Sequence, residues 1–370
     1  MNQKTDDVII KTHLGLVSGA KKKNGFLFKG IPYGADTSGE NRWKAPQEPN
    51  AWDGVFEAKE FGPQCPQFRM GEGGFRGSIA SAYGVEIPEE ESINESEDCL
   101  RLNIYTPDVE PNKKFPVMFW IHGGALRYGS GDPYLPQGIL SKDVLLVTIN
   151  YRLGELGFFS HPSIEDDAPT TNFGLLDQIK ALEWVKTNIE SFGGDPDNIT
   201  IFGESAGGLS VAALLVSPLS NGLFHKAVVQ SGGFARMDLH YREKNELGMS
   251  GDMLGLSFCA ACGVKEGPDQ LDEMRNLPVD TIIQKGIGFP STLFVDDFSM
   301  LSGVIEGFEK GINHKVPTII GTNADEGTAL YWGSPLPDEP PPVDTVETVS
   351  YTHLRAHETR EDRGWRGGRG

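Results

Sequence analysis

A serine lies in the pentapeptide Gly203-Glu-Ser-Ala-Gly207, between a β-branched run and a stretch rich in alanine, leucine and valine. The run from Ile199 to Phe202 is typical of a buried strand, and the proline-free stretch from Leu209 to Val216 favours a helix. A serine in so sharp a turn is strained, and the flanking glycines relieve the clash that a Cβ would cause. We interpret Ser205 as an acyl-transfer nucleophile that faces the positive end of the following helix. The alternative is an ordinary glycine-rich turn.

Such a nucleophile needs hydrogen-bond donors for the oxyanion, a base, and an acid that orients the base. The donors have candidates in His122-Gly-Gly-Ala125, which directly follows the unbroken apolar run from Pro116 to Ile121. Glycines at 123 and 124 let backbone N–H groups approach a substrate, and Ala206 supplies another N–H. The alternative for two adjacent glycines is a plain turn. Their position after a buried strand favours the oxyanion hole.

Buried strands alternate with helices along the middle of the chain. Apolar runs at 144–150, 226–230 and 316–321 predict further strands, and the helical spacing from Leu175 to Val185 predicts a helix. This alternation predicts an α/β fold with a mostly parallel central sheet flanked by helices. The segment from Met237 to about Pro290 is polar and helical, as expected for helices that cap a substrate gorge.

Composition excludes some classes of partner. The chain has 370 residues and a formal net charge of -19, which argues against nucleic-acid partners and anionic membranes. Its first residues contain no apolar stretch of signal-peptide length, and no later run is long enough to span a bilayer, so we expect a cytoplasmic protein. The spacing of Cys259 and Cys262 suits redox chemistry or zinc, but no partner motif completes a metal site. We expect two small buried side chains there and no metal.

Several segments resemble the type-B carboxylesterases, the family of the cholinesterases, and especially the bacterial para-nitrobenzyl-type esterases. The matching segments lie at 29–33, 97–104, 120–124, 150–153, 192–196 and 202–208, and the resemblance covers about residues 8 to 332. It implies an α/β-hydrolase fold and cofactor-free hydrolysis of small carboxylic esters through an acyl-enzyme. It also implies that Ser205 is the nucleophile and that Gly123, Gly124 and Ala206 form the oxyanion hole.

The resemblance also assigns roles to residues that the sequence alone leaves open. The family's triad acid corresponds to Glu326, although without the family Asp325 would be an equal candidate. Glu204 corresponds to a buried second carboxylate that tunes the site, and Ser231 to a serine hydrogen-bonded behind the triad. The family's first disulfide pair corresponds to Cys65 and Cys99, a possible disulfide here; the alternative is that both thiols stay reduced in a cytosolic protein.

The catalytic histidine has no clear counterpart. In the family it lies far beyond the acid, after a block of helices that this sequence lacks. His353 and His357 follow Glu326, but they stand in a segment without apolar periodicity and are weak candidates. We therefore expect an incomplete, C-terminally truncated hydrolase domain over 1–333 and a non-native or disordered tail over 334–370. Because loss of the base costs about 10⁴–10⁶ in kcat, the printed chain should be nearly inactive.

A non-catalytic, cholinesterase-like interaction protein is the alternative function. Such proteins usually lose the nucleophile, whereas Ser205, the glycines at 123 and 124, and Glu326 are all present here. The sequence therefore favours an esterase that acts on a small-molecule ester, and it leaves the oligomeric state open.

Overall fold

The computed structural model describes residues 7–68, 93–136, 138–166, 170–232, 239–245, 247–324 and 326. It divides into two compact units, the first formed by Met1–Phe68 and Glu91–Gly321, the second by Arg69–Glu90 and Thr322–Gly370. His353, His357 and the predicted tail lie outside the described residues. The elements below all belong to the first unit.

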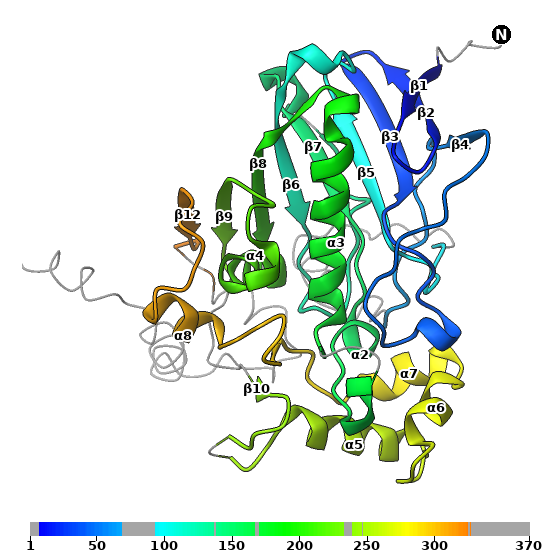
Figure 1. Ribbon diagram of the computed structural model, residues 1–370, viewed down its shortest axis with the longest axis vertical. Coiled ribbons are helices and arrows are strands. Elements are labelled where there is room, and N and C mark those ends of the chain that lie inside the picture. The colour runs from blue at the N-terminus through cyan, green and yellow to red at the C-terminus, as the bar shows by residue number, and fades with distance from the viewer. Residues whose placement is uncertain are drawn as a thin grey trace, which may run out of the picture. The chain divides into compact units, whose positions relative to one another are not determined.

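A large mixed sheet forms the centre of the first unit (Figure 1). Among the described residues it has ten strands, in the order β1-β2-β3-β5-β7-β6-β8-β9-β12, with β4 beside β2. Their bounds are β1 Asp7–Lys11, β2 Leu16–Lys22, β3 Gly25–Pro32, β4 Val55–Glu57, β5 Arg101–Thr106, β6 Phe115–Ile121, β7 Leu145–Ile149, β8 Gly194–Glu204, β9 Lys226–Gln230 and β12 Thr318–Gly321.

The predicted parallel pairing is present in the half of the sheet that carries Ser205. Strands β7, β6, β8, β9 and β12 pair in parallel, whereas β1, β2, β3, β5 and β7 pair antiparallel. Short turns can join antiparallel neighbours, while parallel neighbours need long crossovers. The segments that connect the parallel strands can therefore shape a site at the carboxyl ends of those strands.

Two long helices cover one face of this sheet. Helix α3 (Phe173–Asn188) lies along the strands in Figure 1, and α4 (Ala206–Val216) follows β8 directly. Beyond the carboxyl ends of the parallel strands lie α2 (Gly154–Gly157), α5 (Gly251–Ala261), α6 (Gln270–Arg275) and α7 (Val279–Gly286). The prediction of a helical segment between about 237 and 290 is confirmed. The short strands β10 (Leu239–His240) and β11 (Phe294–Val295) and helix α8 (Val304–Glu309) were not predicted.

The alternation of side chains along β6 explains why its sequence is apolar throughout. Val117, Phe119 and Ile121 join the large core, whereas Trp120 joins a smaller cluster with Tyr105 and Leu146. Successive side chains of a strand point to opposite faces, so both faces of β6 are covered. A fully buried side chain of this size stabilises the fold by about 1.5–3 kcal/mol.

A buried ion pair fixes the chain between β7 and α2 to helix α3. Arg152 donates from Nε to Asp177 Oδ2 at 2.8 Å and from Nη2 to Oδ1 at 2.7 Å, and the Arg152 backbone N–H also bonds Oδ2 at 3.0 Å. The two side chains are 3% and 0% exposed. Because each charge is desolvated, each depends on the other for its stability in the fold.

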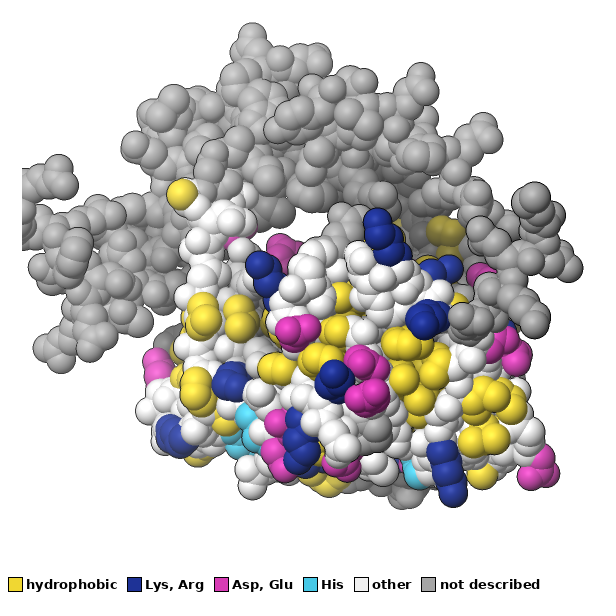
Figure 2. Space-filling model, turned by 90° about the horizontal axis from the view of Figure 1, so that it is seen from above, with side chains coloured by type: hydrophobic (Ala, Val, Ile, Leu, Met, Phe, Trp, Pro, Cys, Tyr) yellow, Lys and Arg dark blue, Asp and Glu magenta, His cyan; other side chains and the backbone are white. Residues whose placement is uncertain are grey.

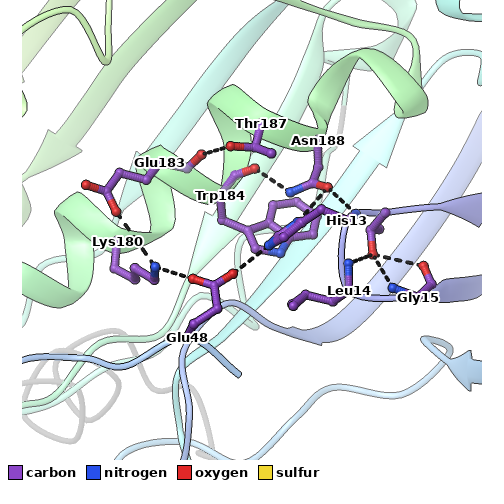
Figure 3. A network of polar contacts seen from close by, with 10 residues as sticks. His13, Leu14, Gly15, Glu48, Lys180, Glu183, Trp184, Thr187 and Asn188 are labelled. Carbon is purple, nitrogen blue, oxygen red and sulfur yellow. Dashed lines mark hydrogen bonds and ion pairs between the residues drawn. The ribbon is translucent and has the colours of Figure 1, made fainter. Parts of the chain in front are cut away.

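A partly exposed network holds the turn between β1 and β2 on α3 (Figure 3). His13 contacts Glu48 at 2.6 Å and Asn188 Oδ1 at 2.9 Å, and Lys180 pairs with the same Glu48 carboxylate. Partial burial raises the pKa of Glu48, but hydrogen bonds from Lys180 and His13 outweigh it and leave that pKa below its ordinary value. His13 therefore has a structural partner.

All four cysteines are free thiols in this structure. Cys65 and Cys99, the pair implied by the resemblance, are buried neighbours rather than a disulfide. The Cys65 thiol and burial raise the pKa of Cys99 well above its ordinary value. Burial raises the pKa of Cys259 to about 12 and that of Cys262 to about 11, as expected for packed rather than reactive thiols.

The surface of the described residues carries charges of both signs. On the face in Figure 2, Lys and Arg side chains are interspersed with Asp and Glu side chains and with apolar patches. Within the described ranges, the helices are all too short or too polar to cross a bilayer. The cytoplasmic location remains a prediction.

Candidate active site

Ser205 occupies the strained turn that the sequence predicts. It lies between the end of β8 and the first residue of α4, with φ 55° and ψ -122°, a backbone conformation that costs a residue with a side chain about 1–3 kcal/mol. Its backbone N–H donates to Gln230 O on β9 at 2.9 Å, and its carbonyl accepts from Leu209 N at 2.9 Å. The sheet and the helix thus hold the turn from both sides, and the serine remains partly exposed.

The two flanking glycines are required by close backbone approaches. A Cβ on Gly207 would lie 2.1 Å from Ile121 O, and one on Gly203 would lie 2.5 Å from the Gly207 carbonyl carbon. These are backbone atoms, which cannot turn aside as a flexible side chain can. The pentapeptide pattern is therefore a packing requirement of the β8–α4 turn against the end of β6.

The glycine loop lies directly against the serine. A Cβ on Gly123 would lie 3.2 Å from Ser205 Cβ and 2.6 Å from Glu204 O. Gly124 has φ 108°, and a Cβ there would lie 2.0 Å from Tyr128 O. Ala206 is the first residue of α4, so its N–H has no acceptor within the helix. The structure brings together the residues predicted for the nucleophile and the oxyanion hole.

His122 supports this loop and is not a candidate base. Its ring is fully buried, stacks on Tyr151 with centroids 4.4 Å apart, and lies 2.8 Å from Gly123 O through Nδ1. Tyr151 Oη donates to His122 O at 2.8 Å. Burial lowers the pKa of His122 to about 4, so the ring is neutral at neutral pH and Nδ1 carries the donated proton.

The other described histidines hydrogen-bond or pair with residues away from Ser205. His13 contacts Glu48, His161 contacts Gln270, His225 accepts from Ile199 N, His240 pairs with Asp297, and His314 contacts Ser220. These contacts give each of these histidines a structural role. The two weak candidates, His353 and His357, lie outside the described residues.

Of the two supporting residues, one differs from its expectation. Glu204 is exposed, so its expected burial is wrong for this structure, while its supporting role stays a prediction. It is the last residue of β8, and its Oε2 would lie 3.3 Å from a Cβ on Gly123. Ser231 directly follows β9, has φ 49°, and donates from its backbone N–H to Gly321 O at 2.8 Å.

Glu326 belongs to the second unit, where its Oε1 accepts the Asn323 N–H at 2.7 Å. Its competitor Asp325 lies outside the described residues. The assignment of Glu326 as the triad acid therefore stays a prediction.

Sequence reasoning missed the residues that support the glycine loop from behind. Tyr151 contacts His122 through both its ring and its hydroxyl. Arg127 hydrogen-bonds Glu155 on α2 and Gly286 on α7. Tyr151 could have been found, because it stands directly after a predicted strand. Arg127 gave no local signal, since its partners are distant in sequence.

Comparisons with known proteins agree with this geometry. A family model described as the carboxylesterase family matches residues 6–356. The para-nitrobenzyl esterase of Bacillus subtilis (strain 168) is 37% identical over 337 residues, which are 87% of this chain and 64% of that protein. The fumonisin B1 esterase of Sphingopyxis macrogoltabida is 36% identical over 336 residues, which are 88% of this chain and 58% of that protein.

Solved structures show the same likeness. A structure titled PNB esterase superposes with a TM-score of 0.74 at 32% identity, covering 93% of this chain and 68% of that one. A carboxylesterase of Geobacillus stearothermophilus superposes with a TM-score of 0.75 at 31% identity, covering 95% and 71%. The chain thus spans less than two thirds of the length of the two curated relatives above, at 64% and 58%.

Proposed function

The chain belongs to the carboxylesterase family and has its α/β-hydrolase fold, and we propose that it carries the site of a serine ester hydrolase with Ser205 as the nucleophile. One observation supports this most strongly. The strained turn of Ser205 and the loop at Gly123 meet so closely that an added Cβ at Gly123 would touch Ser205 Cβ. A reacting ester carbonyl placed beside Ser205 would therefore also lie beside backbone donors.

In the proposed reaction, Ser205 Oγ attacks the carbonyl carbon of a carboxylic ester, and the C=O electron pair moves onto oxygen. The N–H groups of Gly123, Gly124 and Ala206 stabilise that oxyanion. Its collapse breaks the bond to the alcohol and forms an acyl-enzyme, and the alcohol leaves with the proton lost by the Ser205 hydroxyl. Water then hydrolyses the acyl-enzyme and restores the serine. The steps need no cofactor.

Glu326 is the proposed acid, and the base is the open part of the proposal. Only His353 and His357 follow Glu326 in the sequence, and the family match includes the first of them. A base must reach within about 2.6–3.2 Å of the serine hydroxyl. Because neither histidine stands in a periodic segment, we propose that the printed chain works without an effective base.

The substrate class is a small carboxylic ester. The two relatives are named for different esters, one for a para-nitrobenzyl ester and one for fumonisin B1. The residues that touch Ser205 act on the ester group that such substrates share. We therefore propose the ester class and assign no particular acyl or alcohol part.

Slow hydrolysis of p-nitrophenyl butyrate by the full chain is the expected result. An oxyanion hole and substrate binding alone give about 10³–10⁴ over the rate in water. After the initial acylation of Ser205, the steady-state rate of the wild-type chain should match that of Ser205→Ala, because no base assists turnover of the acyl-enzyme. Steady-state rates of both proteins, with the chain in urea as the reference, test the proposal.

Two outcomes would change this proposal. A steady-state rate well above that of Ser205→Ala would show that a base is present, and His353→Ala and His357→Ala would then identify it. A rate no faster for the folded chain than for the chain in urea would contradict an oxyanion hole at this site.

A further inference from the structure

An arginine directly beyond the glycine loop is clamped between two other elements. We call residues 122–128 the oxyanion loop. Arg127 donates from Nη1 to Gly286 O, the last residue of α7, at 2.8 Å. Its Nη2 donates to Glu155 Oε1 on α2 at 3.2 Å. The carbonyl groups at the end of a helix lack intrahelical donors, so a cation is favoured at this place.

The oxyanion loop needs such an anchor because its own backbone is strained. Ala125 and Leu126, between Gly124 and Arg127, have φ 55° and 58°. The N–H groups of Arg127 and Tyr128 both bond Gly124 O, at 2.9 and 3.0 Å. Residues held in this way cost about 1–3 kcal/mol each and persist only where their surroundings impose them.

Glu155 is built into the fold around Arg127. It is 6% exposed, and its backbone carbonyl accepts the Trp43 indole N–H at 2.7 Å. Its carboxylate also lies against α7, where a Cβ on Gly286 would lie 2.1 Å from Glu155 Oε2. Gly154 N also donates to Leu126 O at 2.7 Å, so α2 holds the loop through its backbone and through Glu155.

Glu155 changes charge close to neutral pH. Burial raises its pKa to about 7, although the Arg127 charge acts in the opposite direction. Charged or titratable groups on the elements around α2 are Arg127 in the loop, Asp280 and Lys285 on α7, Cys262 at the end of α5, Arg152 paired with Asp177 on α3, and Arg42 paired with Glu97. The raised pKa of Cys262 keeps it neutral where Glu155 titrates.

We propose that Arg127 is the positioning residue of the oxyanion loop. The charge of Glu155 decides whether Arg127 holds the loop against α2 and α7. The carboxylate draws the guanidinium inward, and the loop is then fixed beside Ser205. Protonation of Glu155 removes that attraction and leaves Arg127, which is 24% exposed, free to turn to solvent. The consequence for ester hydrolysis rests on the proposed function, whereas the clamp itself does not.

Hydrogen exchange of the full chain tests the clamp without any need for catalysis. Peptides covering 122–128 are followed at about pH 6 and about pH 8, on either side of the Glu155 pKa, and corrected for intrinsic exchange. We expect protection of these amides to fall by roughly 2–30-fold at the lower pH, the range typical of residues that couple two elements. Glu155→Gln imitates the protonated acid and should show the low protection at both pH values.

Two further variants sharpen the result. Arg127→Lys keeps the charge but loses the planar fork that reaches both acceptors, so it should lower protection at pH 8. Lys285→Gln removes the charge next to Gly286 on α7 and should keep the wild-type pH response. A wild-type loop whose protection is the same at both pH values, or which changes equally in Glu155→Gln, overturns the proposal.

A second readout separates this proposal from the proposed function. The rate at which p-nitrophenyl butyrate acylates Ser205 is compared between wild type and Glu155→Gln. The wild-type rate divided by the Glu155→Gln rate should rise between pH 6 and pH 8. If the loop responds to pH but Ser205 is never acylated, the clamp stands and the esterase site fails. If Ser205 is acylated at a rate independent of Glu155 and the loop does not respond, the clamp fails and the esterase site stands.

Discussion

Gly124→Ala is expected to lower the rate of Ser205 acylation by about 10²–10³, the cost of losing one oxyanion donor. Gly124 has φ 108°, and the added Cβ would lie 2.0 Å from Tyr128 O. Since both atoms belong to the same tight turn, the loop must move, and its N–H groups then no longer point at the oxyanion. The measurement is the time course of p-nitrophenolate release by the full chain with p-nitrophenyl butyrate in excess.

Gly222→Ala is the matched control for this change. Gly222 also has a positive φ, 79°, but an added Cβ there would meet nothing within 4 Å. It thus carries the backbone strain of a glycine substitution without any contact near Ser205. Equal acylation rates in the two variants would contradict the role given to Gly124.

Asp177→Ala is expected to lower the free energy of unfolding by about 3–5 kcal/mol, the cost of leaving a buried charge without its partner. Arg152 keeps 3% exposure and loses three hydrogen bonds to the Asp177 carboxylate. The change also frees the start of α2 from α3. Urea denaturation followed by tryptophan fluorescence measures the effect.

An exposed ion pair on another helix supplies the comparison. Glu306 pairs with Lys310 at 2.6 Å on α8, where the two side chains are 52% and 57% exposed. Glu306→Ala should change the free energy of unfolding by less than about 1 kcal/mol, because exposed pairs are well solvated. If Asp177→Ala and Glu306→Ala shift the urea midpoint equally, the Arg152 pair does not have the importance that its burial implies.

The parts of the fold that depend on local sequence could be predicted. The turn at Ser205 was predictable because a β-branched run, two glycines and an alanine-rich helix lie side by side in the sequence. Strand β9 has the predicted bounds, Lys226–Gln230, and the apolar run of β6 indicated burial on both faces. These signals are hydrophobic patterns and backbone requirements within a few residues of each other.

The remaining features depend on contacts between distant residues. The antiparallel half of the sheet is fixed by pairings such as that of β3 with β5, about which the strand patterns say nothing. Arg127 contacts Glu155 and Gly286 because the fold places α2 and α7 beside it.

Direct detection of a butyryl group on Ser205 is the most decisive measurement. The full chain is incubated with p-nitrophenyl butyrate, quenched in acid and mapped by peptide mass spectrometry, beside Ser205→Ala and the chain in urea. Because deacylation also needs a base, the acyl-enzyme should accumulate, on Ser205 and only in the folded wild-type chain. Butyrylation that is absent, or that persists in Ser205→Ala, would contradict the assignment of Ser205 as the nucleophile.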